Sequence, residues 1–223
     1  MKTQIGTLGE KSLHAALKTR YCPDPACHEV EVAGGVADIC CEGRIVEIQT
    51  GSLFAVRRKL DRYYACRIPN VTVIYPLIRK KWICRVDPET GEVSRRRSPK
   101  TGKPWDALYE LSHLTPYLCD PRLELILLET DVDEYRGAQN ERGRAERIDR
   151  IPLCYGREIP LRSAEDFRCF LPEGLPDPFT VRDLCGITRY HTRRATAGLY
   201  VLCSVGVLRK EKEGRKNVYY RQL

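Results

Sequence analysis

The chain has 223 residues, of which 42% are hydrophobic and 30% charged, and its formal net charge is +8 at pH 7. This length suits one sizeable core, or a core with a small appended module. No stretch approaches the ~18 apolar residues of a membrane-spanning helix, and the opening MKTQI lacks the pattern of a signal peptide. We therefore expect a cytoplasmic protein with no membrane association.

The positive charge is concentrated in two segments. Residues 179–223 hold ten Lys/Arg against three Asp/Glu, and residues 79–103 hold nine against three. Clustered positive charge favours a polyanion partner such as nucleic acid, because each phosphate contact releases counterions. The alternative is a well-solvated surface, which explains most charge runs.

The first third of the chain predicts the order helix, three strands, helix, strand. Apolar residues recur at helical spacing over 7–19, where Thr7 and Glu10 form a capping box. Strands are predicted at 28–33, 36–41 and 44–49, and Ser52 is the expected N-cap of a helix that runs to Tyr64. The apolar run at 70–78 is typical of a strand that is covered on both faces.

The middle of the chain predicts a second hairpin over 81–96, turning at DPETGE. A mobile basic loop, SPKTGKP, and a short helix over 105–114 follow it. LELILLET at 123–130 is a strong strand prediction. The segment 131–150 is highly charged and weakly periodic, and we expect RGAQNERGRAERIDR, residues 136–150, to be the most flexible part of the chain.

The C-terminal segment predicts a helix-turn-helix followed by a two-stranded ribbon. A first helix is expected over 163–171, a short helix over 180–184, a turn over 185–187 and a longer helix over 188–204. A strand, a basic turn and a strand come next. This order resembles winged-helix domains, with a core expected from Leu199, Leu202, Val205, Val207 and Leu208.

Three polar residues interrupt the apolar hairpin GGVADICCEGRIVEIQTGS. If Glu42-Gly43 forms its two-residue turn, Asp38 lies opposite Glu47, with Cβ atoms roughly 5 Å apart. Strand alternation places Gln49 on the same side as Glu47. Facing carboxylates must be relieved by a proton, a cation or a metal, and oxygen-only ligands suit Mg²⁺ or Mn²⁺.

Two residues of the first predicted helix bear on this acid pair. Glu10 belongs to the apolar stripe of that helix, so it either caps the helix or reaches the acidic cluster. His14, one turn later, is expected to be a hydrogen-bonded or half-exposed histidine rather than a metal ligand.

The α-β-β-β-α-β order, the helix glutamate, VADI and VEIQ together resemble the PD-(D/E)xK nuclease superfamily, whose fold is restriction-endonuclease-like, over residues 1–78. The resemblance implies that Asp38 and Glu47 bind Mg²⁺, that the Ile48 carbonyl contributes, and that Glu10 assists. Gln49 stands where the family usually has lysine, and it carries no positive charge. Arg57 is the candidate replacement cation, and a solvated arginine packed along apolar surface is the alternative.

The C-terminal module supplies the candidate DNA contacts. The start of its longer helix and the following ribbon carry residues suited to the major groove and to phosphates: Arg189, Tyr190, Arg193, Arg194, Arg209, Lys210, Arg215 and Lys216. His191 belongs to the same helix start, and Lys212 to the same ribbon. The alternative for a winged helix is an interaction or dimerisation module.

Eleven cysteines without an export signal are expected to be reduced, small apolar residues. Cys22 and Cys27 have a spacing that could begin a zinc site, but no second pair stands at a suitable distance along the chain. Cys40 and Cys41 alternate across a strand and cannot both face one ion. Structural packing is therefore the interpretation for all eleven.

These observations predict a two-part α/β protein. Residues 1–155 form a restriction-endonuclease-like domain extended by a hairpin and a strand, and residues 156–223 form a linker and a winged helix. The predicted activity is Mg²⁺- or Mn²⁺-dependent hydrolysis of double-stranded DNA, with Asp38, Glu47, Gln49 and Glu10 as catalytic residues. A non-catalytic DNA-binding or regulatory protein is the alternative. RNA as the substrate and a homodimer both remain open.

Overall fold

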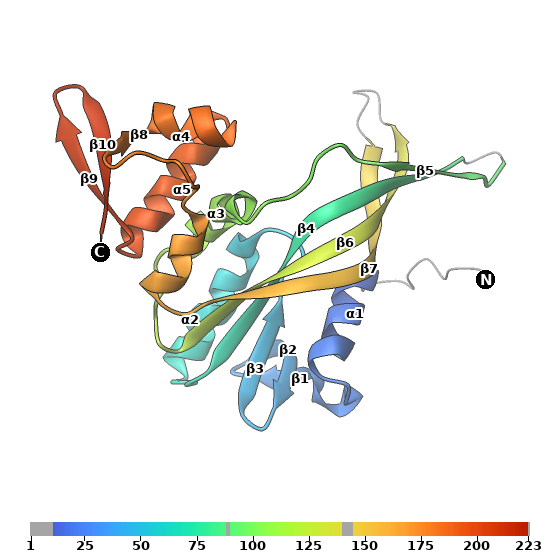
Figure 1. The fold of residues 1–223 in the computed structure, drawn as a ribbon. Helices are drawn as coiled ribbons and strands as arrows, with labels where there is room; N and C mark the ends of the chain where they lie inside the picture. Colours follow the sequence, from blue (N-terminus) through green and yellow to red (C-terminus); the bar gives the residue numbers. More distant parts are fainter. Residues whose placement is uncertain (1–10, 88–89, 140–144, 223) are drawn as a thin grey trace. The chain divides into compact units, whose positions relative to one another are not determined.

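The structure, a computed structural model, describes residues 11–87, 90–139 and 145–222. Within these ranges the protein is mixed α/β, as expected (Figure 1). The α-helices are α1 (Ser12–Tyr21), α2 (Arg57–Ala65), α3 (Trp105–Leu111), α4 (Val181–Thr188) and α5 (Thr192–Ser204). Short 3-10 helices are η1 (Pro25–Cys27), η2 (Leu53–Val56), η3 (Ser112–Leu114) and η4 (Ala164–Phe170). No helix in these ranges is long and apolar enough to cross a membrane.

The large sheet of the described chain has seven strands. Their order is β1-β2-β3-β4-β6-β7, and β5 pairs with β4 outside this path. The strands are β1 (His28–Val32), β2 (Gly35–Cys41), β3 (Arg44–Ile48), β4 (Val71–Val86), β5 (Val93–Arg97), β6 (Leu123–Gln139) and β7 (Ala145–Leu161). A second, three-stranded sheet has the order β8-β10-β9, with β8 (Phe179–Thr180), β9 (Leu208–Glu213) and β10 (Lys216–Arg221).

Two tight turns create the antiparallel meander β1-β2-β3. Ala33 and Gly34 have φ values of +52° and +69°, and Glu42 and Gly43 have +50° and +76°. Two consecutive positive φ values define a type I′ turn, whose twist matches that of the flanking strands. The predicted hairpin turn at Glu42-Gly43 is therefore confirmed.

Helix α1 begins later than predicted. Lys11 is its N-cap with extended backbone angles (φ −76°, ψ 140°), and Ser12 is the first helical residue. The predicted capping box of Thr7 and Glu10 lies outside the described residues. Leu13 and Leu17 are buried, and α1 packs against β3.

Strand β4 is longer than predicted, because the expected interruption near residue 79 is absent. It pairs with β5 through the predicted hairpin, with Val86 opposite Val93. The loop SPKTGKP is held along β4: the Gly102 N–H donates to the Arg79 carbonyl oxygen at 2.8 Å. A Cβ atom at Gly102 would lie 2.1 Å from the Ile78 carbonyl oxygen, so this approach requires glycine.

The prediction of a flexible stretch over 136–150 is wrong for its described residues, which lie in strands. Strand β6 continues to Gln139 and β7 begins at Ala145. Glu134 of β6 is only 1% exposed, and it binds cations on three strands. These cations are Lys81 (3.2 Å), Arg136 (2.6 Å) and Arg150 (3.1 Å). Charged side chains of β6 and β7, which the sequence pattern would place in solvent, therefore form ion pairs across the strands.

The described fold divides into two compact units. Of the described residues, the first comprises 11–50, 73–87, 90–103, 127–139 and 145–159, and the second comprises 51–72, 104–126 and 160–222. The second unit therefore takes in two segments that precede residue 155 as well as the C-terminal residues.

The C-terminal helices are shifted relative to the prediction. Helix α4 runs on through Cys185–Ile187, where a turn was expected, and the turn lies at Arg189–His191. A capping box between Thr180 and Asp183 starts α4, and Arg189 ends it with φ +60°. The five apolar residues predicted for the core of this segment are all buried.

Candidate functional site

The two predicted acids lie on adjacent antiparallel strands. Ile39 pairs with Val46 and Cys40 with Ile45, so paired residue numbers add up to 85, as predicted. In this register Asp38 and Glu47 occupy the next pair of positions, where β3 approaches its end. Alternation places their side chains on the same sheet face.

The carboxylate of Asp38 is held in a fixed orientation. Its Oδ2 accepts a hydrogen bond from the Ile48 backbone N–H at 2.7 Å, and it lies 3.3 Å from His14 Nε2. The side chain of Asp38 is 16% exposed and that of His14 is 22% exposed. A side chain of β2 thus bonds to the backbone of β3, which fixes the spacing of the two strands beside Glu47.

Glu47 is deeply buried, with 2% of its surface exposed. Gln49, two residues later, is half-buried. Its backbone N–H donates to the Ile74 carbonyl oxygen of β4 at 2.9 Å, which fixes the chain where it leaves β3. Asp38 therefore lies on β2 next to the end of β3 that carries Glu47 and leads to Gln49, while Glu10 lies outside the described residues.

His14 is the residue at this site whose contact the sequence did not predict. It was expected to be hydrogen-bonded or half-exposed, and the structure gives it Asp38 as a partner. Leu13 and Leu17 orient α1 by packing in the core, and this places His14 above β2. In the sequence, the indication that His14 lies near the core is that it directly follows Leu13, which is buried.

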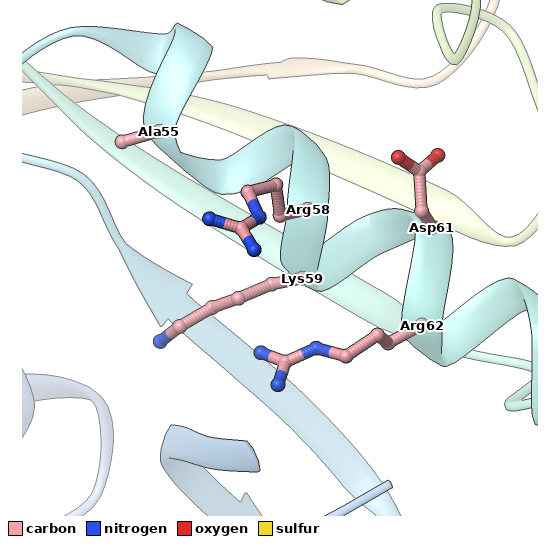
Figure 2. A pocket seen from close by; sticks show the side chains of 5 residues that line it. All are labelled: Ala55, Arg58, Lys59, Asp61 and Arg62. Atoms are coloured by element: carbon pink, nitrogen blue, oxygen red, sulfur yellow. The ribbon is translucent and has the colours of Figure 1, made fainter. Parts of the chain in front are cut away.

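Arg57, the candidate replacement for the family lysine, has contacts inside the second unit. Its guanidinium lies 5.4 Å from the ring centroid of Phe54. A pocket beside η2 and α2 is lined by Ala55, Arg58, Lys59, Asp61 and Arg62. Figure 2 shows the three cationic side chains projecting on one side of the helix, away from Asp61.

Three of the predicted DNA contacts pack against α3. Arg194 Nη1 lies 3.1 Å from Asp106 Oδ1, and Arg193 Nη2 donates to the Tyr109 hydroxyl at 3.2 Å. Tyr190 stacks on Trp105, with ring centroids 6.3 Å apart. Burial and the Asp106 carboxylate raise the pKa of the Tyr190 hydroxyl.

The remaining predicted DNA contacts are exposed. Arg189 lies at the C-terminal end of α4, and the others lie on the β9–β10 ribbon. Arg209 lies over the ring of Tyr220 at 5.2 Å and also pairs with Glu211. The exposed Arg215 and Lys216 follow Gly214 at the tip of the ribbon. The cationic surface of this module is therefore centred on the ribbon.

Metal-ligating side chains also gather away from the acids. In the part of the chain that the structure describes, the one group of three such side chains within mutual ligand distance is Cys22, Cys27 and Cys41. All eleven cysteines are free thiols.

The sequence model of a family described as "Domain of unknown function (DUF8091)" matches residues 11–162. The chain belongs to this family. The DUF8091 match includes β2, β3 and both long strands β6 and β7, and it ends before the C-terminal module. An uncharacterized protein of Treponema pallidum (strain Nichols) is 28% identical over 165 residues, which cover 74% of this chain and 64% of that relative. No solved structure matches.

Proposed function

We propose that this protein is a metal-dependent nuclease with a restriction-endonuclease-like core, and that it hydrolyses double-stranded DNA held by a C-terminal winged helix. The observation that carries the proposal is the placement of Asp38 and Glu47 at neighbouring positions of one hairpin, with Asp38 oriented by the Ile48 N–H. Carboxylates at neighbouring positions of two adjacent strands are suited to sharing one divalent cation.

The donor set fits a hard cation. Asp38 and Glu47 offer only carboxylate oxygens, and the family resemblance adds the Ile48 carbonyl, which suits Mg²⁺ or Mn²⁺ better than a thiophilic ion. When bound, such an ion polarises a phosphodiester and lowers the pKa of an attacking water. His14 orients the Asp38 carboxylate, and Gln49 orients water through its amide.

The C-terminal module supports the DNA part of the proposal. The order β8, α4, turn, α5, β9, β10 supports a winged-helix assignment, in which the β9–β10 ribbon would be the wing. Exposed cations at the wing, Lys210, Arg215 and Lys216, suit phosphate contacts. Because Arg193 and Arg194 contact α3, we assign the principal DNA contacts to the wing and fewer to the start of α5.

The test is cleavage of supercoiled plasmid and of a duplex oligonucleotide by the full chain, with Mg²⁺, Mn²⁺ or a chelator. Asp38→Asn and Glu47→Gln are compared with Glu31→Gln, an exposed acid of β1. We expect metal-dependent cutting that falls at least about 100-fold in both site variants, as when one charge-stabilising group is lost. The control is expected to cut normally. Cutting that survives in both site variants would refute the proposed site.

A second candidate is a DNA-binding protein without catalysis, favoured by Gln49, which places no charge where hydroxide and a developing phosphorane need one. Salt-sensitive binding of the duplex with no cutting in either metal would establish this alternative. An RNA duplex of the same sequence is included in both assays. Cutting of the RNA alone would move the proposed substrate from DNA to RNA.

A further inference from the structure

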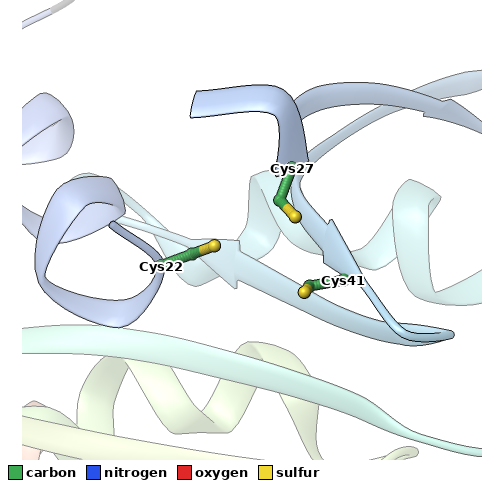
Figure 3. Close-up of side chains that lie close together, drawn as sticks. All are labelled: Cys22, Cys27 and Cys41. Atoms are coloured by element: carbon green, nitrogen blue, oxygen red, sulfur yellow. The ribbon is translucent and has the colours of Figure 1, made fainter. Parts of the chain in front are cut away.

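Three cysteines from separate parts of the first unit meet at one point. Cys22 is the C-cap of α1, Cys27 ends η1, and Cys41 ends β2 just before the hairpin turn. Figure 3 shows the three side chains directed into a common space. Their sulfur atoms all lie within 4.8 Å of one another.

The backbone around each thiol is fixed by hydrogen bonds. The Cys22 N–H donates to the Lys18 carbonyl oxygen at 2.8 Å, and His28 Nε2 lies 2.8 Å from the Cys22 carbonyl oxygen. Because a carbonyl oxygen only accepts, His28 donates this bond through Nε2. The Asp24 side chain accepts from the Ala26 N–H at 2.9 Å and shapes the turn that presents Cys27.

The sheet register selects which of two neighbouring cysteines joins the group. His28 pairs with Ile39, so the start of β1 lies beside the end of β2. Cys40 and Cys41 point to opposite faces of β2, and Cys41 is the one directed at Cys22 and Cys27. Cys40 is therefore a matched control, adjacent in sequence and outside the group.

We propose that Cys22, Cys27 and Cys41 bind one Zn²⁺ ion as three thiolates, with a solvent molecule as the fourth ligand. A Zn–S bond of about 2.3 Å in a tetrahedron requires sulfur atoms about 3.8 Å apart, so sulfurs within 4.8 Å need only small side-chain rotations to close on the ion. Thiolates select zinc over the hard cations that suit Asp38 and Glu47. This site is separate from the proposed nuclease site.

The negative charges of three neighbouring thiolates favour the binding of a cation. The three sulfur atoms lie within 4.8 Å of one another, so thiolates at these positions would repel one another. Ionising all three thiols side by side without a cation is unfavourable, whereas a bound divalent ion reverses this and deprotonates its thiol ligands. Zinc binding is therefore expected to release protons and to join the end of α1 to β1 and β2.

The test uses the full chain, purified reduced and loaded with Zn²⁺, then separated from loose metal by gel filtration. We expect one zinc per chain in the wild type and in Cys40→Ser, and loss of the retained zinc in Cys22→Ser, Cys27→Ser and Cys41→Ser. Co²⁺ in place of Zn²⁺ should give sulfur-to-cobalt charge-transfer absorption in the wild type, weaker in each of these three variants. A wild type that retains no zinc, or three variants that all retain it, would overturn the proposal.

A measurement on the wild type decides the question if these variants fail to fold. Alkylation of the reduced chain, mapped by mass spectrometry with and without Zn²⁺, should show zinc-dependent protection of the three ligands. The exposed Cys66, Cys119, Cys154 and Cys169 serve as internal controls and should react equally in both samples. Equal reactivity of Cys22, Cys27 and Cys41 with and without zinc would contradict the site.

Discussion

Replacing Glu134 with Gln tests whether ion pairing holds the charged strands β6 and β7 together. The substitution keeps the shape of a side chain that is 1% exposed and removes its charge. Lys81, Arg136 and Arg150 then lose their common anion. Breaking a buried ion pair from one side costs about 3–5 kcal/mol, and the partial exposure of the three cations places this loss at the lower end of that range.

The pKa of Glu134 gives a second value for the stability that this ionised side chain contributes. Burial alone would raise this pKa, but Arg136, Arg150 and Lys81 together lower it from 4.5 to about 2. A depressed carboxyl pKa contributes stability that is present above the unfolded value and lost as the pH falls toward the folded value. A shift of this size corresponds to about 3 kcal/mol, lost between pH 4.5 and about 2.

The assay is urea unfolding of the wild type and Glu134→Gln at a series of pH values from 7 to 2.5. Other carboxyls also titrate in this range, so the informative quantity is the difference in unfolding free energy between the two proteins. We expect about 3 kcal/mol at pH 7, shrinking steadily below pH 4.5. Glu146→Gln, an exposed acid of β7, is the control. A difference that stays constant across the series would refute the ion-pair account.

Three further substitutions test the packing and the wing. Gly198→Val should lower the thermal midpoint, because a Cβ there lies 2.6 Å from Trp105 Cζ2, and overpacking costs about 1–3 kcal/mol. Gly102→Ala should also lower the thermal midpoint, because the added Cβ would clash with the Ile78 carbonyl oxygen. Lys216→Ala should weaken duplex binding in a filter or anisotropy assay and reduce the salt slope by about 0.9, the value for one phosphate contact.

Two control substitutions separate these effects from a general loss of stability or of DNA binding. Gly186 of α4 has no atom within 4 Å of a built Cβ, so Gly186→Ala should leave the thermal midpoint unchanged or raise it. Arg182→Ala, an exposed cation at the start of α4, should keep the salt slope of the wild type if the wing makes the contacts. Equal slopes for Lys216→Ala and the wild type would contradict the wing assignment.

The hairpin that carries Asp38 and Glu47 was predictable because neighbouring residues in the chain determine its turn and its register. Gly43 adopts positive φ without steric cost and Glu42 precedes it at φ +50°, so the pair forms the turn, and the turn sets the register of every pair that follows. The prediction for Ser52 was confirmed for the same reason, since its side chain accepts from the Phe54 N–H. Such elements depend on residues within a few positions of one another.

The charged hairpin of β6 and β7 was not predictable from local pattern. Glu134 is compensated by Lys81 and Arg150, which lie 53 and 16 residues away in the chain. A pattern of alternating charges is typical of solvated segments, and only the tertiary partners distinguish a paired strand from a loop. The group of Cys22, Cys27 and Cys41 could not be predicted from local pattern either, because Cys41 lies far in sequence from the other two.

The C-terminal turn was misplaced for a different physical reason. Gly186 in the middle of α4 indicated a turn, but the capping box of Thr180 and Asp183 starts the helix firmly enough to continue past it. The contacts of Arg193 and Arg194 with α3 depend on tertiary packing and left no sign in the sequence.

The type I′ turn between β2 and β3 leaves only Glu42 and Gly43 outside the strand pairing, so the turn itself sets the interval from Asp38 to Glu47. A slip of the pairing by one position would send Glu47 through to the reverse surface of the sheet. An amino acid added at the turn need not cause this slip, because a three-residue loop can hold it while the strands keep their register. An amino acid added within β3, before Glu47, has no such outlet except a bulge, and a small insertion library would separate the two cases.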